Sequence, residues 1–126
     1  MEISRSSGAM VRGRIASFRY AFAGLWVMIR TQPNAWIHAV ATLVVVGAGI
    51  HFALPGRDWA LLVGAIGLVW MAESLNTAIE FLADAAVPDH HALIKHAKDI
   101  AAAAVLLASL AAALIGALVF APHLLL

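Results

Sequence analysis

Charged residues are scarce in this sequence. Only 12% of its 126 residues are Asp, Glu, Lys or Arg, whereas 63% are hydrophobic, and the mean hydropathy is +0.93. A water-soluble domain of this length needs a polar surface, and this composition cannot provide one. The sequence therefore predicts an integral membrane protein, and its length suits one small domain.

Cysteine is absent, which excludes disulfides and thiolate metal sites. The formal net charge is +1, and no basic cluster is interleaved with aromatic residues, so nucleic acid is not an expected partner. Two phosphate-handling motifs are also missing, namely the Walker pattern Gly-x-x-x-x-Gly-Lys-Ser/Thr and the catalytic loop of protein kinases. Any phosphoryl transfer would need an unrelated site.

The first part of the chain predicts a mobile tail over residues 1–9 and an amphipathic helix over residues 10–30. In that helix three arginines, Arg12, Arg19 and Arg30, lie opposite a broad aliphatic and aromatic face. Such a pattern suits a helix that lies in the membrane interface, where arginines meet anionic headgroups. It suits equally well a helix packed against partner helices, and the sequence leaves both open.

Three apolar segments follow, over residues 35–54, 59–84 and 92–121, each close to or above the ~20 residues that cross a bilayer. They are bounded by Thr31-Gln-Pro-Asn34, by the turn Pro55-Gly-Arg-Asp58 and by a loop around Pro88. The predicted fold class is an all-α membrane protein with an N-terminal surface helix and three transmembrane helices. Residues 10–126 are expected to form a single domain.

The third segment carries a ridge of small residues spaced three or four apart, which lets helix backbones approach closely in lipid. The ridge consists of Ala97, Ala101, Ala104, Ala108, Ala112 and Gly116.

The basic residues predict the orientation in the membrane. Seven of the eight lie before the first span or beside the loop between spans two and three, and only Arg57 lies on the other side. Lysine and arginine concentrate on the cytoplasmic side of membrane proteins. We therefore expect a cytoplasmic N-terminus and a cytoplasmic second loop, in a bacterial inner membrane.

A polar stripe interrupts the second span. Glu73, Asn76, Glu80 and Asp84 stand at positions i, i+3, i+7 and i+11, which at about 100° per residue fall within an arc of roughly 80° on one helix face. The span before them, from Trp59 to Ala72, has no charge. Ionisable groups at membrane depth are costly, so the stripe indicates a functional site.

Polar residues also open the third span, which a short loop joins to the stripe, so the two groups are expected to meet. Carboxylates can hold Mg²⁺ together with phosphate oxygens, lysine can neutralise phosphate charge, and a carboxylate can accept a hydroxyl proton. These are the parts that a phosphoryl transfer needs. The residues singled out at the opening of the third span are Asp89, His90, His91, Lys95, Lys98 and Asp99.

Alternatives remain at this point. Glu80 and Lys98 could form a structural ion pair, and Asn76 could join helices by hydrogen bonds. Intramembrane carboxylates also serve transporters, although the inverted repeats and broken helices of many transporters are absent. The isolated histidines His38, His51 and His123 are expected to make local hydrogen bonds or mark interfaces rather than bind metal.

The stripe and its neighbours resemble the small bacterial lipid kinases, the diacylglycerol and undecaprenol kinases. The resemblance lies in Glu73-Ser-Leu-Asn76-Thr-Ala-Ile-Glu80-Phe-Leu-Ala-Asp84, in Pro88-Asp-His-His91-Ala-Leu93 and in Ala97-Lys98-Asp99. Upstream, Phe18-Arg-Tyr20-Ala-Phe-Ala-Gly24-Leu and Asn34-Ala-Trp-Ile-His38 also fit. It covers roughly residues 14–120, and its motifs are long and correctly spaced.

The resemblance implies a homotrimer with active sites shared between chains, MgATP as phosphoryl donor and a lipid alcohol as acceptor. Glu73 matches the general base, Asn76 its polar partner, and Glu80 a carboxylate that binds metal and nucleotide. Other positions match nucleotide-contacting residues of the family. These are Tyr20, Asp89, His90, His91, Lys98 and Asp99.

Two positions depart from the family pattern. Gln32 stands where a second metal-binding glutamate is usual and offers only a neutral oxygen to metal or nucleotide, and Trp36 replaces a common arginine. Asn34-x-x-Ile-His38 and Lys95-x-Ala-Lys98-Asp99 favour the undecaprenol branch. We expect a MgATP-dependent lipid kinase with undecaprenol preferred over diacylglycerol. The rival is a non-catalytic member of the family that binds nucleotide or lipid, with Gln32 as its main support.

Overall fold

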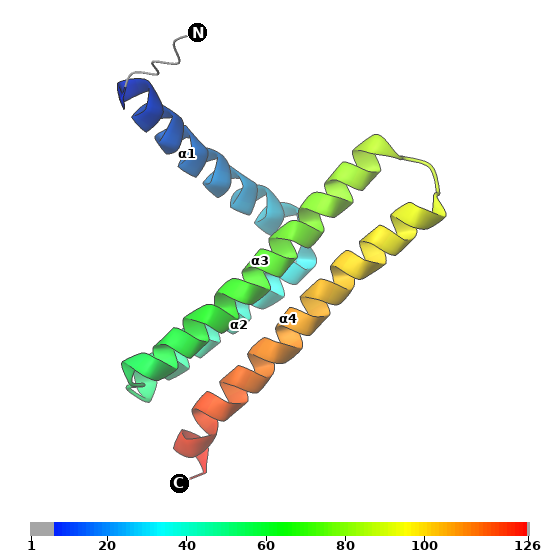
Figure 1. Cartoon of the computed structure of the whole chain (residues 1–126). Coiled ribbons are helices and arrows are strands. Elements are labelled where there is room, and N and C mark those ends of the chain that lie inside the picture. The colour runs from blue at the N-terminus through cyan, green and yellow to red at the C-terminus, as the bar shows by residue number, and fades with distance from the viewer. Residues whose placement is uncertain (1–6, 126) are drawn as a thin grey trace. The chain divides into compact units, whose positions relative to one another are not determined.

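The computed structural model describes residues 7–125, which form four helices: α1 (Ser7–Thr31), α2 (Pro33–His51), α3 (Gly56–Ala86) and α4 (Ala92–Leu124) (Figure 1). The three helices α2, α3 and α4 are each long and apolar enough to cross a membrane. The predicted all-helical architecture with three spans is thereby confirmed. The helices group into two compact units, α1 with Gln32 and α2 to α4, which are described separately.

The α1 unit is one helix that starts earlier than its sequence pattern predicts. Most of the tail expected over residues 1–9 lies outside the described residues, and residues 7–9 are already helical. A lone glycine such as Gly8 costs a helix only about 1 kcal/mol, so it does not stop the helix. Nearly all side chains of α1 are exposed within the chain, and the Arg19 and Arg30 guanidinium groups lie over the rings of Tyr20 and Trp26.

The predicted break between the first two helices is confirmed and narrow. The Gln32 N–H donates to the Met28 carbonyl oxygen at 2.9 Å, and Pro33 then opens α2. Proline suits the first position of a helix because its missing N–H would have no partner there. For this reason α2 begins two residues before the predicted start of the first span.

The turn between α2 and α3 is held by backbone hydrogen bonds and a small apolar cluster. The Leu54 N–H donates to the Gly49 carbonyl oxygen at 3.2 Å, and Ala53 has a positive φ of 50°. Leu54 is buried together with Leu62 of α3 and Val119 of α4. This end of the α2–α4 unit is therefore the one fixed by hydrophobic packing.

Helices α3 and α4 form a long antiparallel hairpin closed by residues 87–91 (Figure 1). Ala101 and Ala108, two members of the predicted small-residue ridge, are buried in this hairpin. The other four members line cavities between α4 and α3, so the whole ridge lies on the side of α4 that faces α3. The hairpin brings the polar stripe of α3 beside the polar start of α4.

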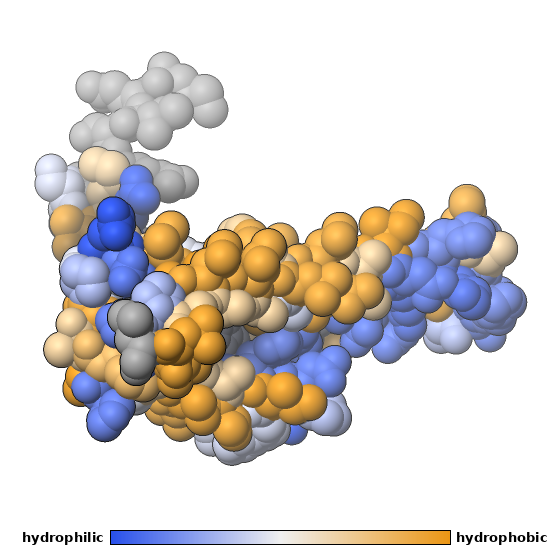
Figure 2. Space-filling view, turned by 90° about the horizontal axis from the view of Figure 1, so that it is seen from below, coloured by the Kyte–Doolittle hydropathy of each residue, from blue (hydrophilic) through white to orange (hydrophobic). Residues whose placement is uncertain are grey.

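Hydrophobic side chains cover most of the surface in Figure 2, and hydrophilic residues gather at the end of the hairpin near residues 87–91, at the right of the view. Large exposed side chains occur along the whole length of the spans, for example Leu43, Leu82 and Leu118. In water such a surface would aggregate, whereas lipid chains or neighbouring chains can cover it.

Gly49 is required by the close approach of α2 to α3. A Cβ atom at this position would lie 2.7 Å from the Trp59 ring, whereas one at Gly47, on the same helix, would meet nothing within 4 Å. We predict that Gly49→Ala lowers the free energy of unfolding by about 1–3 kcal/mol, the usual cost of overpacking. Gly47→Ala is the matched control and should be neutral or stabilising, because alanine favours a helix by roughly 0.5–1 kcal/mol over glycine. Unfolding in detergent measures both, and equal stability of the two variants would contradict the packing argument.

Candidate active site

The polar stripe of α3 grades from buried to exposed along the helix. Glu73 is 1% exposed and Asn76 8%, Glu80 is half-buried, and the Asp84 side chain is 67% exposed. The exposure rises toward the loop at residues 87–91, which is the polar end of the hairpin. The stripe therefore connects a buried carboxylate to the part of the hairpin that water can reach.

The depth of Glu73 follows from helix geometry. At about 1.5 Å per residue, Glu73 lies about 21 Å along α3 from Trp59, at the turn end. With one edge of a hydrocarbon layer about 30 Å thick near Trp59, Glu73 lies about 9 Å inside the opposite edge. In this placement the carboxylate lies within the apolar layer, in the half that adjoins the polar end of the hairpin.

The Glu73 carboxylate has one nearby chargeable partner in the described part of the chain. Its Oε2 atom lies 3.4 Å from Nε2 of His38 on α2. The two atoms are within ion-pair distance but are not aligned as a hydrogen bond, so Oε2 is buried without a hydrogen-bond partner among residues 7–125. Four residues further along α3, the Thr77 hydroxyl donates to the backbone carbonyl oxygen of Glu73 at 2.9 Å.

His38 is the residue that sequence reasoning missed. The sequence treats it as an isolated histidine, whereas in the structure it faces the most buried carboxylate of the stripe. Its place at the end of the motif Asn34-Ala-Trp-Ile-His38 was the available signal. The contact itself depends on which side of α2 faces α3, and a single-helix pattern does not contain that information.

Asn76 lies on the α4 side of the stripe. It lines a cavity of ≈ 580 Å³ between α3 and α4 whose other lining residues are apolar, and its Oδ1 atom is buried without a hydrogen-bond partner in the described structure. The alternative role for Asn76, a hydrogen bond that joins helices, is therefore not supported for this oxygen. A buried amide oxygen without a partner is costly, which indicates a place for a donor from a ligand or another chain.

The polar ends of α3 and α4 meet, as predicted. Lys98 Nζ lies 2.5 Å from Asp84 Oδ1. The alternative interpretation of the sequence, an ion pair between Lys98 and Glu80, is therefore wrong, because Lys98 pairs with Asp84. Glu80 has no ion-pair partner within residues 7–125. The structure thus leaves the Glu80 carboxylate available.

The remaining predicted nucleotide residues of this unit surround the hairpin end. Asp99 pairs with Lys95 at 2.6 Å, and the His91 ring caps α4 by accepting the Leu93 N–H on Nδ1 at 3.1 Å. Asp89 and His90 are exposed in the loop. Asp99 and His91 are thus held by short-range contacts within α4 and at its start, which a phosphate group could replace.

Two predicted site residues belong to the α1 unit. Tyr20 is 67% exposed, and Gln32 is half-buried, with its side-chain amide donating to the Thr31 hydroxyl at 3.4 Å. Their place beside the other site residues stays a prediction.

The residues present fit Mg²⁺ that is bound together with a nucleotide. No three His, Cys, Asp or Glu side chains gather into a metal-binding cluster in the described ranges. Mg²⁺ commonly takes one or two carboxylates and completes its shell with phosphate oxygens and water. Glu80 is a carboxylate with no competing cation, which suits this mode of binding.

Together, three membrane-spanning helices and an intramembrane carboxylate beside a polar, lysine-bearing hairpin end define a helical membrane protein with a polar site at one membrane face. The family model described as prokaryotic diacylglycerol kinase matches residues 19–120, and the chain belongs to this family. No solved structure gives a significant match.

Two curated relatives cover most of the chain. It is 39% identical over 108 residues to an undecaprenol kinase of Bacillus subtilis. The matched residues make up 86% of this chain and 88% of that relative. It is 41% identical over 112 residues to a diacylglycerol kinase of a Synechocystis species. The matched residues make up 88% of this chain and 64% of that relative.

The Asp84–Lys98 pair should contribute little to stability. Asp84 is largely exposed and Lys98 is 35% exposed, and ion pairs in such positions are worth about 0–1 kcal/mol. We predict that Asp84→Asn lowers the free energy of unfolding in detergent by less than about 1 kcal/mol. Asp89→Asn, in the exposed loop and without an ion pair within residues 7–125, is the matched control. Loss of folded protein in the Asp84 variant alone would show that the pair is a structural requirement.

Proposed function

We propose that this protein transfers the γ-phosphoryl group of MgATP to the hydroxyl of a membrane lipid alcohol. The observation that carries the proposal is the carboxylate of Glu73, which is 1% exposed on a membrane-spanning helix. A charged group in that position needs a reason, and a general base is one. Both relatives named above are kinases of lipid alcohols, which supports the same reaction here.

In the proposed reaction the lipid oxygen attacks the γ-phosphorus, and its hydroxyl proton passes to the Glu73 carboxylate. A new O–P bond forms to the lipid oxygen as the bond between the γ-phosphorus and the β,γ-bridging oxygen breaks. The products are a lipid phosphate and ADP, and Glu73 later releases the proton to water. Asn76, one turn from Glu73 on the same face, is suited to orient the attacking hydroxyl through its amide.

The depth of the base matches the acceptor. Lipid hydroxyls lie near the boundary of the hydrocarbon layer, and Glu73 lies only about 9 Å inside that boundary on the polar side. ATP cannot enter the apolar layer, so its γ-phosphate must reach inward from the hairpin end. The graded stripe from Asp84 through Glu80 to Glu73 provides this path.

The nucleotide side of the site is assigned to the polar hairpin end. Lys98, on leaving Asp84, would neutralise phosphate charge. Asp89, His90, His91 and Asp99, with Tyr20 from α1, complete the nucleotide contacts that the family resemblance implies. Glu80 would hold Mg²⁺ together with the phosphates, and Gln32 would offer a neutral oxygen. The ion, when bound, offsets negative charge on the transferring group.

Undecaprenol is the preferred acceptor and diacylglycerol the second. The relatives do not decide between the two lipids, because the undecaprenol kinase is 39% identical and the diacylglycerol kinase 41% identical. The preference rests on the motifs Asn34-x-x-Ile-His38 and Lys95-x-Ala-Lys98-Asp99. The test of the function is transfer of radiolabelled phosphate from ATP to undecaprenol or diacylglycerol in detergent micelles. ATP consumption that depends on the added lipid supports the kinase, whereas nucleotide binding without turnover on either lipid contradicts it.

We further propose that the protein works as a homotrimer in the bacterial inner membrane, with α1 as a surface helix and residues 10–126 as one domain. Helix α2 supports an assembly, because Ala35 and Gly49 are its only buried residues within the described chain. Much of its surface is therefore available to lipid or to neighbouring chains. The shared sites implied by the family resemblance would form at such contacts.

Glu73→Gln should abolish most turnover while leaving the nucleotide in place. Glutamine keeps the shape of the side chain but cannot accept the proton. We predict a fall in kcat of about 10²- to 10⁴-fold, the usual contribution of a positioned acid–base group, with little change in the KM for ATP. Steady-state kinetics on the folded variant measure both, and near-normal turnover would exclude Glu73 as the base.

Orientation can be tested with single cysteines because the chain has none of its own. The distribution of basic residues predicts that Pro55–Asp58 is periplasmic and that the Asp84–His91 loop is cytoplasmic. A cysteine at Gly56 should therefore react with a membrane-impermeant thiol reagent added to intact spheroplasts, and one at Ala86 should not. Lysed cells are the control, since both cysteines should then react. The reverse pattern in intact spheroplasts would place the proposed site on the side without ATP.

A further inference from the structure

Four side chains from two helices form one cluster: His38 and Thr42 from α2, and Trp70 and Glu73 from α3. His38 and Thr42 are four residues apart, and Trp70 and Glu73 are three apart, so each pair shares one face of its helix. The cluster is therefore a contact of one turn of α2 with one turn of α3.

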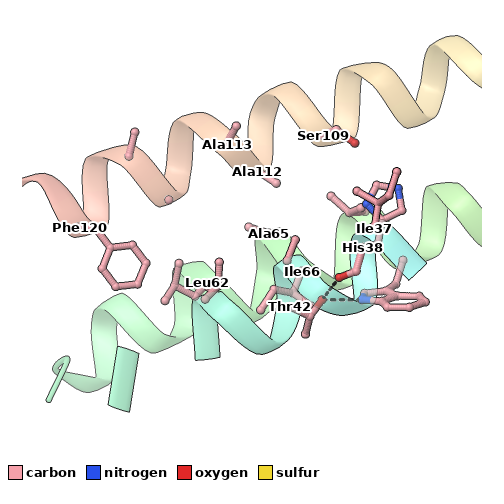
Figure 3. Close-up of a pocket in the computed structure, with 16 residues that line it drawn as sticks. Ile37, His38, Thr42, Leu62, Ala65, Ile66, Ser109, Ala112, Ala113 and Phe120 are labelled. Atoms are coloured by element: carbon pink, nitrogen blue, oxygen red, sulfur yellow. Dashed lines mark hydrogen bonds between the residues drawn. The ribbon is translucent and has the colours of Figure 1, made fainter. Parts of the chain in front are cut away.

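Hydrogen bonds fix this contact. The Trp70 indole N–H donates to the Thr42 hydroxyl at 3.0 Å, and that hydroxyl donates to the His38 carbonyl oxygen at 2.7 Å (Figure 3). The Trp70 ring also meets the imidazole edge-on, with ring centroids 6.4 Å apart and planes at 65°. The backbone and the ring of His38 are thus held against α3, beside Glu73.

The surroundings of the cluster are apolar. His38 and Thr42 line a cavity of ≈ 470 Å³ between α2, α3 and α4, whose other walls are mainly aliphatic (Figure 3). Within the described residues the His38 side chain is 16% exposed, and the carboxylate behind it is 1% exposed. A carboxylate in such surroundings is costly unless a donor faces it, and the N–H of an imidazole is the donor that the structure brings to it.

We propose that His38 is a positioning residue for Glu73. Its Nε2–H holds the Oε2 atom of the carboxylate, which leaves Oε1 to receive the lipid proton. At 3.4 Å the two atoms are within ion-pair distance but form no hydrogen bond in the structure, and the proposed role requires that this contact shorten when substrates bind. The assignment rests on the proposed kinase function. It adds to that function a residue of α2 that positions the catalytic base on α3.

The role needs a donor at the end of the side chain and does not need a positive charge. Glutamine and methionine are close in length and volume, but only glutamine carries N–H groups at its end. His38→Gln and His38→Met therefore separate donation from space filling, which replacement by alanine would not do. His51 lies on the same helix, with its ring against Phe52 at 5.0 Å, and His51→Gln and His51→Met are the matched controls.

Steady-state phosphorylation of undecaprenol or diacylglycerol by the full-length chain tests the proposal. We expect His38→Met to lower kcat by about 10²-fold, the scale of a misplaced catalytic group, with KM for ATP and lipid within a factor of about two. His38→Gln should stay within about tenfold of wild type, and both His51 variants should match wild type. In the Glu73→Gln background, His38→Met should add less than a further factor of about two, because it acts through Glu73.

Equal kcat for His38→Gln and His38→Met, or losses that multiply in the double variant with Glu73→Gln, would overturn the assignment. Melting temperatures of all variants in detergent are measured alongside. A kcat deficit that disappears once activity is normalised to folded protein also overturns it. A wild-type chain that phosphorylates neither lipid contradicts the kinase function instead, so the two failures are distinguishable.

Discussion

The structure depends on one costly arrangement, a carboxylate held inside an apolar span. Glu73 is 1% exposed. Among residues 7–125, the only chargeable neighbour of its Oε2 atom is the His38 imidazole, at 3.4 Å. A charge in such a place lowers stability unless it is paired, so neighbouring elements are constrained to bring a partner. The contact between one turn of α2 and one turn of α3 brings His38 to ion-pair distance of the carboxylate, and the hydrogen bond from Trp70 to Thr42 joins the two helices there.

The α3–α4 hairpin extends this site toward the aqueous phase. Its polar end carries exposed side chains in weak, short-range pairs, of which Asp84 with Lys98 is the example that joins the two helices. Weak pairs cost little to break, which fits the nucleotide site proposed for this end of the hairpin. Deep in the hairpin the contacts are instead small and apolar, as at Ala101 and Ala108, which are both buried.

The membrane class, the three spans and the polar face of α3 were predictable because each depends on the residue pattern of a single helix. The scarcity of charge predicts a membrane protein, and the lengths of the apolar runs predict three spans, which the structure confirms. The spacing of Glu73, Asn76, Glu80 and Asp84 predicts one polar face, and their graded burial follows the order of the chain. Helix ends were less predictable: α2 starts at Pro33 because proline fits a first turn, and α3 continues to Ala86 because nothing before Val87 stops it.

The sequence by itself determined the class of protein, the order of its helices, the polar face of α3 and its motif-level membership of a lipid kinase family. Only the tertiary structure decided that His38 faces Glu73, that Lys98 pairs with Asp84 and not with Glu80, and that Asn76 Oδ1 is buried without a partner. The reason is physical. Periodicity along one helix determines which side chains share a face, but the rotation and register of one helix against another depend on packing, and Gly49 against Trp59 shows how close that packing is.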